Sequence, residues 1–437
     1  MSRDQHPISR KDIAEPALKV LYRLHKAGFD AYLVGGCVRD LLLGIQPKDF
    51  DVATSARPEQ VQKLFRNCRL VGRRFRLAHI MFGREVIEVA TFRGHHDDDN
   101  DDATKHAKRD AQGMLVRDNV YGSIEEDAQR RDFTVNALYY NIADFAIYDF
   151  ANGMRDIEAG VLRMIGDAEN RYREDPVRML RAIRFATKLS MRMDDSVAKP
   201  IAEHASLLQN IPPARLFEEC LKLFTAGKAL ANFELLSEYH LFQQLFPMLK
   251  SYLQAPDEAP YQMLRQTFAD TDSRINQGLS ITPAYLFAAL LWWPLQARME
   301  QLMAESGLPP VDAMNIAAAD VFGRQVQTVA IPKRFTIPAR EIWQLQQRFE
   351  RAKGKRVQSL LGHPRFRAAY DFLLLRTATA TPLERKQLNP QAQFWTEQQQ
   401  QAPATESHKP GKKRGRRGGR RRRGGNAKRG KDDSSAS

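Results

Sequence analysis

The sequence contains few cysteines and no long apolar run. Its three cysteines, Cys37, Cys68 and Cys220, are widely spaced and form no CxxC pair. This pattern argues against a disulfide framework or a structural zinc site and is typical of reduced thiols in the cytosol. The most apolar run, Ala284 to Trp293, is about half as long as a membrane span requires, and residues 1–15 are too polar for a secretory signal. We therefore expect a soluble, cytoplasmic protein that contacts no membrane.

Acidic residues are absent from the basic end of the chain. Between Lys409 and Lys431 there are 13 Lys and Arg and no Asp or Glu, so most of the formal net charge of +15 lies there. Such a concentration of positive charge indicates a polyanionic partner. The low complexity of this segment predicts disorder. We place the start of a disordered basic tail at the Gln-rich residues 391–401, so that the predicted tail is 391–437.

Hydrophobic periodicity divides the 437 residues into an N-terminal α/β region and a helical remainder. The predicted units are an α/β domain at 1–150, an all-α neck at 151–210 and an all-α body at 211–390. Strand patterns cover residues 31–34, 50–53, 78–82, 85–91, 134–141 and 146–150, and helical patterns cover 38–43, 58–65, 177–189, 214–223 and 341–351. The polar stretch His95 to Asp110 has no periodicity and predicts a mobile loop.

A predicted strand runs through Gly35 and Gly36 into a predicted helix that carries Arg39. Glycines allow a phosphate to approach the backbone, and a helix N-terminus offers free N–H groups at the positive end of its dipole. Taken alone, however, this pattern is more often an ordinary tight turn.

Asp49 and Asp51 follow shortly after that helix. Residues i and i+2 of a strand face the same way, roughly 6.6 Å apart by strand rise. Two carboxylates at this spacing can share one Mg²⁺ ion, which also relieves their mutual repulsion. An isolated pair of this kind is usually a solvated loop–strand junction, but Phe50 and Val52 indicate that the opposite strand face is buried. We expect Asp49 and Asp51 to be metal ligands.

A third carboxylate would complete a two-metal phosphoryl-transfer site. Glu88 stands inside an apolar strand, where a lone acid is costly unless it is paired or bound to metal. Asp132 follows Arg130 and Arg131, whose guanidinium groups can neutralise a triphosphate. The sequence leaves both acids open. The segment His95 to Asp99 is not expected to bind metal, because no periodic structure holds its side chains.

Four segments together resemble the template-independent nucleotidyltransferases, a family that includes bacterial poly(A) polymerases and tRNA CCA-adding enzymes. They are LVGGCVRDLLLG with DFDVAT (33–54), IEVATFRG (87–94), RRDFTVNALYY (130–140) and RYREDPVRMLRAIRFA (171–186). The resemblance implies a palm-like catalytic domain followed by a helical neck and body. It also implies that Asp49 and Asp51 hold Mg²⁺, with Mn²⁺ as an alternative, to activate an RNA 3′-hydroxyl group and clamp the triphosphate of ATP.

By position, the resemblance also assigns nucleotide contacts. It places Gly35, Gly36 and Arg39 against the phosphates, and Arg131 and Asp132 against the nucleotide. In this family Asp132 also counts among the catalytic acids.

The resemblance further assigns Asp175, Arg178 and Arg181 to recognition of the base through hydrogen bonds that replace a template. Their spacing would let all three share one helix face, and Asp acceptors and Arg donors suit the edge of a base. Spacing alone favours instead an ordinary ion pair between Glu174 and Arg178.

Two features favour a poly(A) polymerase over a CCA-adding enzyme. Leu70 to His79 resembles the segment that distinguishes bacterial poly(A) polymerases, and its basic cluster around Phe75 can meet phosphates and stack on a base. The basic tail can hold single-stranded RNA without sequence preference. We therefore predict addition of AMP from ATP to RNA 3′ ends, in mRNA processing and decay. The alternatives are a CCA-adding enzyme and a non-catalytic RNA-binding protein. Proteins of RNA decay are candidate partners, and the oligomeric state stays open.

Overall fold

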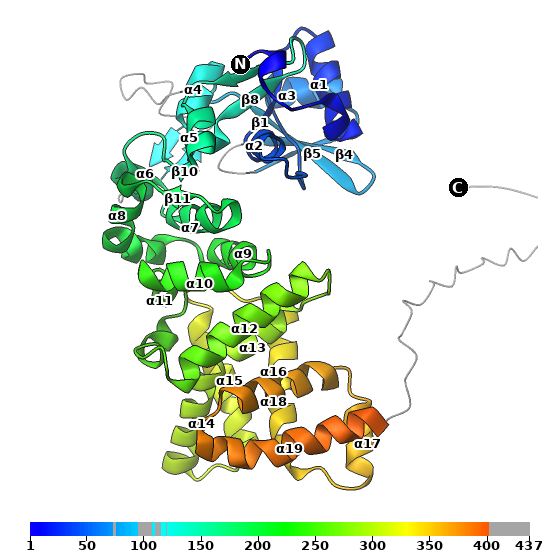
Figure 1. Cartoon of the computed structure of the whole chain (residues 1–437), viewed down its shortest axis with the longest axis vertical. Coiled ribbons are helices and arrows are strands. Elements are labelled where there is room, and N and C mark those ends of the chain that lie inside the picture. Colours follow the sequence, from blue (N-terminus) through cyan, green and yellow to red (C-terminus); the bar gives the residue numbers. More distant parts are fainter. Residues whose placement is uncertain (73–75, 95–106, 110–114, 119, 402–437) are drawn as a thin grey trace, which may run out of the picture.

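The chain forms a curved, elongated molecule with an α/β head at one end and a helical body at the other (Figure 1). The computed structural model describes residues 1–72, 76–94, 107–109, 115–118 and 120–401. The predicted fold class, an α/β domain followed by a helical neck and body, is confirmed. None of the helices in these ranges combines the length and apolarity needed to cross a membrane.

The head is built on one mixed sheet. Its seven described strands are, in order across the sheet, β3 (Cys68–Val71), β4 (Leu77–Phe82), β5 (Glu85–Thr91), β2 (Asp51–Thr54), β1 (Ala31–Val34), β8 (Leu138–Asn141) and β9 (Ile147–Asp149). Strands β2 and β5 pair in parallel, whereas the other pairs in this sheet are antiparallel. The parallel register places Asp51 opposite Glu88. Two candidate acids that are distant in the sequence therefore become neighbours.

Three helices cover one face of this sheet. They are α1 (Glu15–Lys26), α2 (Gly36–Leu42) and α3 (Pro58–Leu64). The apolar stripe of α1, which includes Leu21 and Leu24, packs with the inward side chains of the strands, such as Leu33 and Val52. Asp51 has the opposite parity to Val52 in β2, so it projects from the other face of the sheet. Helix α4 (Ile124–Gln129) contributes its buried Ala128 to the apolar cluster on that other face.

The neck links head and body through a continuous apolar core. Its elements are α5 (Gly153–Ala159), β10 (Val161–Leu162), α6 (Ala168–Glu174), α7 (Val177–Leu189), β11 (Arg192–Met193) and α8 (Asp195–His204). Helix α7 coincides with the predicted helix at 177–189, and its buried face belongs to the same cluster as Phe133 of the head and Phe224 of the body. Its remaining face turns basic side chains toward the head.

The body consists of helices that pack around an aromatic-rich core. They are α9 (Pro213–Phe224), α10 (Ala229–Glu238), α11 (Phe242–Leu245), α12 (Ala259–Asn276), α13 (Pro283–Leu290), α14 (Trp292–Ser306), α15 (Pro310–Gln325), α16 (Lys333–Arg351), α17 (Lys355–Leu361), α18 (Phe366–Thr379) and α19 (Pro382–Gln401). The apolar run at 284–293 is mostly buried, and it spans α13 and the start of α14.

Two predicted boundaries are wrong. Residues 391–401 do not begin a tail but complete α19, where Trp395 is fully buried and packs on Phe349 with ring centroids 4.6 Å apart. The apolar stretch predicted as a strand at 134–141 starts with a 3₁₀ turn at Thr134–Asn136, and β8 begins only at Leu138. In both cases tertiary packing decided a structure that local composition left ambiguous.

Several predicted features fall partly or wholly outside the described ranges. These features are the tail beyond residue 401, the His95 to Asp99 segment, and residues 73–75 of the basic cluster. Within the polar stretch 95–110, residues 107–109 form β6 (Ala107–Arg109), which pairs with β7 (Leu115–Asp118). The prediction of a loop is therefore wrong for these three residues.

Candidate active site

The glycine turn has the conformation that only glycine adopts easily. Gly35 ends β1 with φ 75° and ψ −128° and immediately precedes α2. A Cβ atom at Gly35 would lie 3.3 Å from Nη1 of Arg131. Because Gly35 has no side chain, the Arg131 guanidinium group can lie directly over its backbone. An anionic ligand bound here could contact both backbone N–H groups at the start of α2 and the positive charge of Arg131.

The Asp49–Asp51 pair has the alternation expected from the sequence. Asp49 and Asp51 are exposed, whereas Phe50 and Val52 are buried. In the described part of the chain neither aspartate side chain has a hydrogen-bond or ion-pair partner. Glu88 lies opposite Asp51 on the neighbouring strand and contacts His79 Nε2 at 3.3 Å. An open row of three acids thus crosses β2 and β5.

This row is electrostatically unfavourable by itself. Partial burial and the Glu88 carboxylate raise the pKa of Asp51 to about 6, and Asp49 adds to the effect while Arg131 opposes it. Asp51 still reaches solvent, so water screens part of this repulsion, but its direction follows from the neighbouring charges. Oxygen ligands of this kind, two carboxylates completed by substrate phosphates, suit Mg²⁺. Among the described residues no group of three or more His, Cys, Asp or Glu side chains is itself arranged as a metal cage.

The two candidates for a third acid lie in different environments. The Glu88 side chain is 49% exposed, so the argument that its burial demands a partner is wrong. Its position beside Asp51 is nevertheless what a shared metal site requires. Asp132, in contrast, is buried and receives hydrogen bonds from Asn136 Nδ2 at 3.1 Å and from Arg181 Nε at 2.6 Å.

The negative charge of Asp132 is already neutralised by Arg181 of the neck helix α7. Burial alone would raise its pKa, but Arg181 and the hydrogen bonds from Asn136 and the Phe133 N–H group outweigh burial and hold the pKa at about 2. The ion pair between Asp132 and Arg181 links the head to α7. Lys188 of α7 makes a second link, because its Nζ lies 2.9 Å from Asp40 Oδ2.

Arg39 belongs to the same buried network. Its side chain is 2% exposed, donates from Nε to Asp40 Oδ1 at 2.9 Å, bonds to Asn136, and lies over the Phe185 ring at 5.1 Å. The structure thus places Arg39 beneath the glycine turn, with Nη2 3.5 Å from where a Gly36 Cβ would be. In this arrangement it supports the turn from below.

Arg131 is fixed along one edge and available along the other. Asp127 Oδ2 accepts from Nη2 at 3.0 Å and from Nε at 3.2 Å, and Tyr139 OH accepts from Nε at 2.9 Å. Burial would lower the pKa of Arg131, but Asp127 and Tyr139 outweigh it, so the side chain stays charged. Within the described residues Nη1 has no hydrogen-bond partner, and this is the atom that lies over Gly35.

The three residues assigned to the base do not share one helix. Asp175 is the C-cap of α6 with φ −151°, and α7 starts two residues later, so the expected common helix face is wrong for Asp175. Arg215 of α9 donates to Asp175 Oδ2 at 2.8 Å. Arg178 donates from Nη1 to Glu174 Oε2 at 3.0 Å, which is the ion pair that spacing alone favoured. Both residues are thus held at the junction between α6 and α7.

Arg184 is a residue that the sequence reasoning missed. It is one helical turn beyond Arg181 on α7, and its guanidinium lies 4.6 Å from the Phe185 ring. Burial and the Arg181 charge lower its pKa, and its buried Nε has no hydrogen-bond partner in the described chain. The regular spacing Arg178, Arg181, Arg184 was the available signal. These features make Arg184 a candidate contact for a phosphate.

Comparison with known proteins matches most of the chain. The family description "Poly A polymerase head domain" matches residues 31–163, "Probable RNA and SrmB- binding site of polymerase A" matches 190–253, and "Polymerase A arginine-rich C-terminus" matches 306–429. The matched head contains the glycine turn and the acid row.

Curated relatives cover nearly the whole chain. It is 56% identical to poly(A) polymerase I of Salmonella typhimurium, over 92% of this chain and 86% of that one, and 51% identical to poly(A) polymerase I of Haemophilus influenzae, over 85% and 82%. A CCA-adding enzyme of Listeria monocytogenes is 33% identical over 68% and 72%. The chain therefore belongs to the family of template-independent nucleotidyltransferases that unites poly(A) polymerases and CCA-adding enzymes. Within this family it is a polynucleotide adenylyltransferase of the poly(A) polymerase group.

Solved structures confirm the fold. A Bacillus stearothermophilus CCA-adding enzyme in complex with CTP superposes with a TM-score of 0.57 at 25% identity, covering 88% of this chain and 82% of that one. A tRNA-processing enzyme in its apo form I superposes with a TM-score of 0.61 at 21% identity, covering 92% and 95%. These two enzymes thus share the fold of this chain.

Proposed function

We propose that the chain transfers AMP from ATP to the 3′-hydroxyl group of single-stranded RNA at the open face of the head sheet. The observation that carries this proposal is the row of unpaired acids Asp49 and Asp51 with Glu88, one strand away from the Gly35 turn and Arg131. The RNA 3′-oxygen attacks the α-phosphorus of ATP, pyrophosphate leaves, and the hydroxyl proton passes to a carboxylate of the row.

A divalent cation, Mg²⁺ or Mn²⁺, fits the acid row. Asp49 and Asp51 would hold it, and its charge would offset the burial and the neighbouring Glu88 carboxylate that raise the pKa of Asp51. When bound, the cation polarises the reacting phosphate and lowers the pKa of the attacking hydroxyl. Between the two candidates for a further acid, the geometry favours Glu88, because Asp132 already neutralises Arg181.

The remaining side chains position the nucleotide. Arg131 presents Nη1 over Gly35, where it can bind a phosphate oxygen while Asp127 keeps its orientation. Arg178 and Asp175 stand at the α6–α7 junction, and each is oriented by a charged partner. We assign base selection to these two, because a guanidinium fork and a carboxylate present fixed donors and acceptors to a base edge.

The segment 190–253, matched by the description that names RNA and SrmB binding, comprises α8 to α11 in the lower neck and upper body. We assign to it contacts with the RNA substrate and with proteins of RNA decay.

The direct test is extension of an unstructured RNA primer with Mg²⁺ and each nucleoside triphosphate supplied separately. We expect long ladders with ATP alone, because base selection by side chains resets after each addition. Short products that need CTP and form only on tRNA would establish a CCA-adding enzyme instead. Absence of any extension would leave a non-catalytic RNA-binding protein.

The basic tail gives a separate prediction. Deleting residues 409–437 should weaken RNA affinity and flatten the dependence of log K on log salt by about 0.7 for each lost phosphate contact. Deletion of 432–437 alone, which removes two aspartates and no basic residue, is the matched control. An unchanged salt slope in the longer deletion would show that the tail does not bind RNA.

A further inference from the structure

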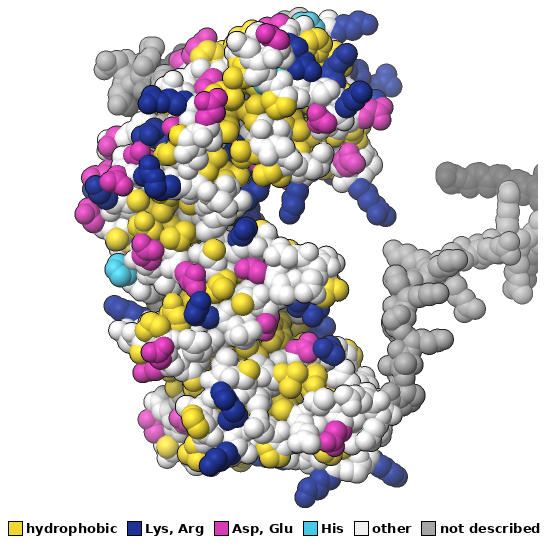
Figure 2. Space-filling model, viewed as in Figure 1, with side chains coloured by type: hydrophobic (Ala, Val, Ile, Leu, Met, Phe, Trp, Pro, Cys, Tyr) yellow, Lys and Arg dark blue, Asp and Glu magenta, His cyan; other side chains and the backbone are white. Residues whose placement is uncertain are grey.

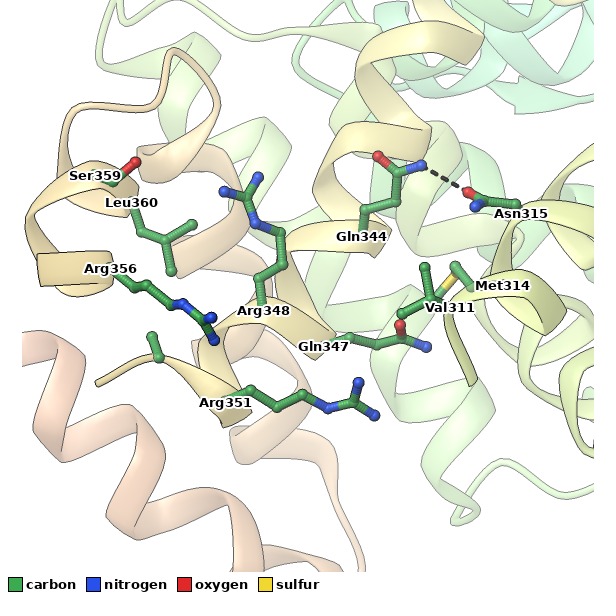
Figure 3. Close-up of a pocket in the computed structure, with 11 residues that line it drawn as sticks. Val311, Met314, Asn315, Gln344, Gln347, Arg348, Arg351, Arg356, Ser359 and Leu360 are labelled. Carbon is green, nitrogen blue, oxygen red and sulfur yellow. Dashed lines mark hydrogen bonds between the residues drawn. The ribbon is translucent and has the colours of Figure 1, made fainter. Parts of the chain in front are cut away.

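A concave pocket lies in the body, on the far side of the neck from the acid row. Its cavity of about 540 Å³ is bounded by α15, α16 and α17 (Figure 3). Gln344, Arg348 and Arg351 line it from α16 at i, i+4 and i+7, so they form one stripe along that helix. We call this cavity the α16 pocket. Its volume falls within the roughly 300–1,000 Å³ typical of small-ligand sites.

Three arginines give the pocket its charge. Arg348 and Arg351 project from α16, and Arg356 reaches toward them from α17 (Figure 3). All three are exposed, and in the described part of the chain none has a carboxylate partner. Several other surface arginines of the body are paired with a carboxylate, as Arg365 is with Glu341 at 3.0 Å. Three neighbouring unpaired guanidinium groups repel one another, so a bound anion would stabilise this arrangement.

The opposite part of the lining is apolar and neutral. Val311 is 49% exposed and, with the buried Met314 beside it, forms an apolar floor near Gln344 and Asn315 (Figure 3). Gln344 Nε2 donates to Asn315 Oδ1 at 2.8 Å. This bond leaves the Gln344 carbonyl oxygen and the Asn315 amide nitrogen as one acceptor and one donor without partners among the described residues. A flat apolar surface beside such an amide pair suits a nucleobase.

We propose that the α16 pocket binds one nucleotide of the RNA substrate, upstream of the 3′ end. Arg348, Arg351 and Arg356 hold its flanking phosphates, and the base lies on the floor formed by Val311 and Met314. This inference rests on the proposed function, since it assigns a subsite for the same RNA. A simple acidic peptide would need neither the apolar floor nor the amide pair, so the lining favours a nucleotide.

The position of the pocket agrees with this assignment. Phe349 of α16, next to Arg348, packs against Trp395 of α19. Gln401, the end of α19, is the sixth residue after Trp395, which corresponds to about 9 Å of helix. The 13 Lys and Arg between residues 409 and 431 follow soon after. The pocket therefore lies close to α19, the last described helix before that basic segment in the sequence.

The test uses the full chain and a matched pair of double variants on the same helix. R348A/R351A removes two charges from the pocket, and K333A/R334A removes two exposed charges from the opposite end of α16. Oligo(A) binding is measured by fluorescence anisotropy across a series of lengths and salt concentrations. We expect R348A/R351A to weaken binding of long oligo(A) about tenfold and to flatten the salt slope by about 1.4, for two lost phosphate contacts.

Primer extension separates this inference from the proposed function. In R348A/R351A the KM for long primers should rise while kcat stays unchanged, and primers too short to reach the pocket should be extended as in the parent chain. Equal losses in both double variants, or unchanged affinity and slope in R348A/R351A, would overturn the inference while leaving AMP transfer intact. Binding of polyglutamate is measured in the same way. If R348A/R351A binds RNA as tightly as the parent chain but no longer binds polyglutamate, the pocket takes an acidic protein partner and the inference is overturned. If the parent chain itself fails to add AMP, the proposed function fails, whatever the binding data show.

Discussion

Asp51→Asn should reduce AMP transfer by about a thousandfold or more, because it removes one of the two carboxylates that we propose hold the divalent cation. The side chain keeps its shape and is exposed on the sheet face, so the fold should be unaffected. Asp49→Asn should reduce AMP transfer to a similar extent. The measurement is single-turnover extension of an RNA primer with ATP and Mg²⁺. Asp30→Asn, at an exposed position just before β1, is the matched control and should retain full activity.

Thermal unfolding distinguishes loss of metal binding from loss of structure. In the parent chain, burial and repulsion by the Glu88 carboxylate raise the pKa of Asp51 to about 6, above the value in an unfolded chain. The folded state therefore binds this proton more tightly, and ionisation of Asp51 reduces stability as pH rises through about 6. At pH 7.5 Asp51→Asn should consequently have a Tm equal to or above that of the parent. Mg²⁺ should raise the Tm of the parent but not that of the variant.

The pH dependence of metal binding follows from the same pKa. Protonated Asp51 cannot act as an anionic ligand, so the apparent affinity for Mg²⁺ should fall as the pH decreases below about 6. A variant that loses activity yet retains the Mg²⁺-induced increase in Tm would contradict the assignment of Asp51 as a metal ligand.

The parts of this site that depend on local pattern could be predicted, whereas those that depend on strand order could not. The alternation of Asp49 to Val52 and the Gly35 turn follow from neighbouring residues, and both are as expected. The place of Glu88 beside Asp51 depends on the pairing of β2 with β5, which no local pattern encodes. The sequence could therefore name Glu88 and Asp132 as candidates but could not choose between them.

The surroundings of the basic residues also could not be predicted from the local sequence, because their partners are distant along the chain. Family position assigns Arg39 to phosphates, but its buried side chain bonds to Asn136, which is far along the chain. The orientation of Asp175 depends on Arg215 in another helix. Helical spacing places Arg178 and Arg181 on one face of α7. Only the packing of α7 on the head determines that Arg181 meets an acid, whereas Arg184 forms no ion pair within the described residues.

The choice between Glu88 and Asp132 leads to the second prediction with a large effect. Asp132→Asn removes the charge that neutralises Arg181 in a buried pair, so it should destabilise the fold by on the order of 3 kcal/mol. Glu88→Gln changes an exposed residue, so it should leave the Tm unchanged and lower kcat strongly. Glu85→Gln, exposed on the same strand, is the matched control for Glu88 and should change neither quantity.

The Tm of each variant and the change in Tm on adding Mg²⁺ separate the roles of these acids. If Asp132 stabilises the head–neck junction, Asp132→Asn should have a lower Tm but still show the Mg²⁺-induced increase, because Asp49 and Asp51 remain. The double variant Asp132→Asn with Arg181→Gln should recover part of the lost stability, since removing both charges leaves neither one buried and unpaired. If Asp132 is instead a metal ligand, the Mg²⁺ response should disappear in Asp132→Asn and persist in Glu88→Gln. That outcome would require Arg181 to release Asp132 when substrate binds, and it would make the head–neck ion pair a part of the catalytic cycle.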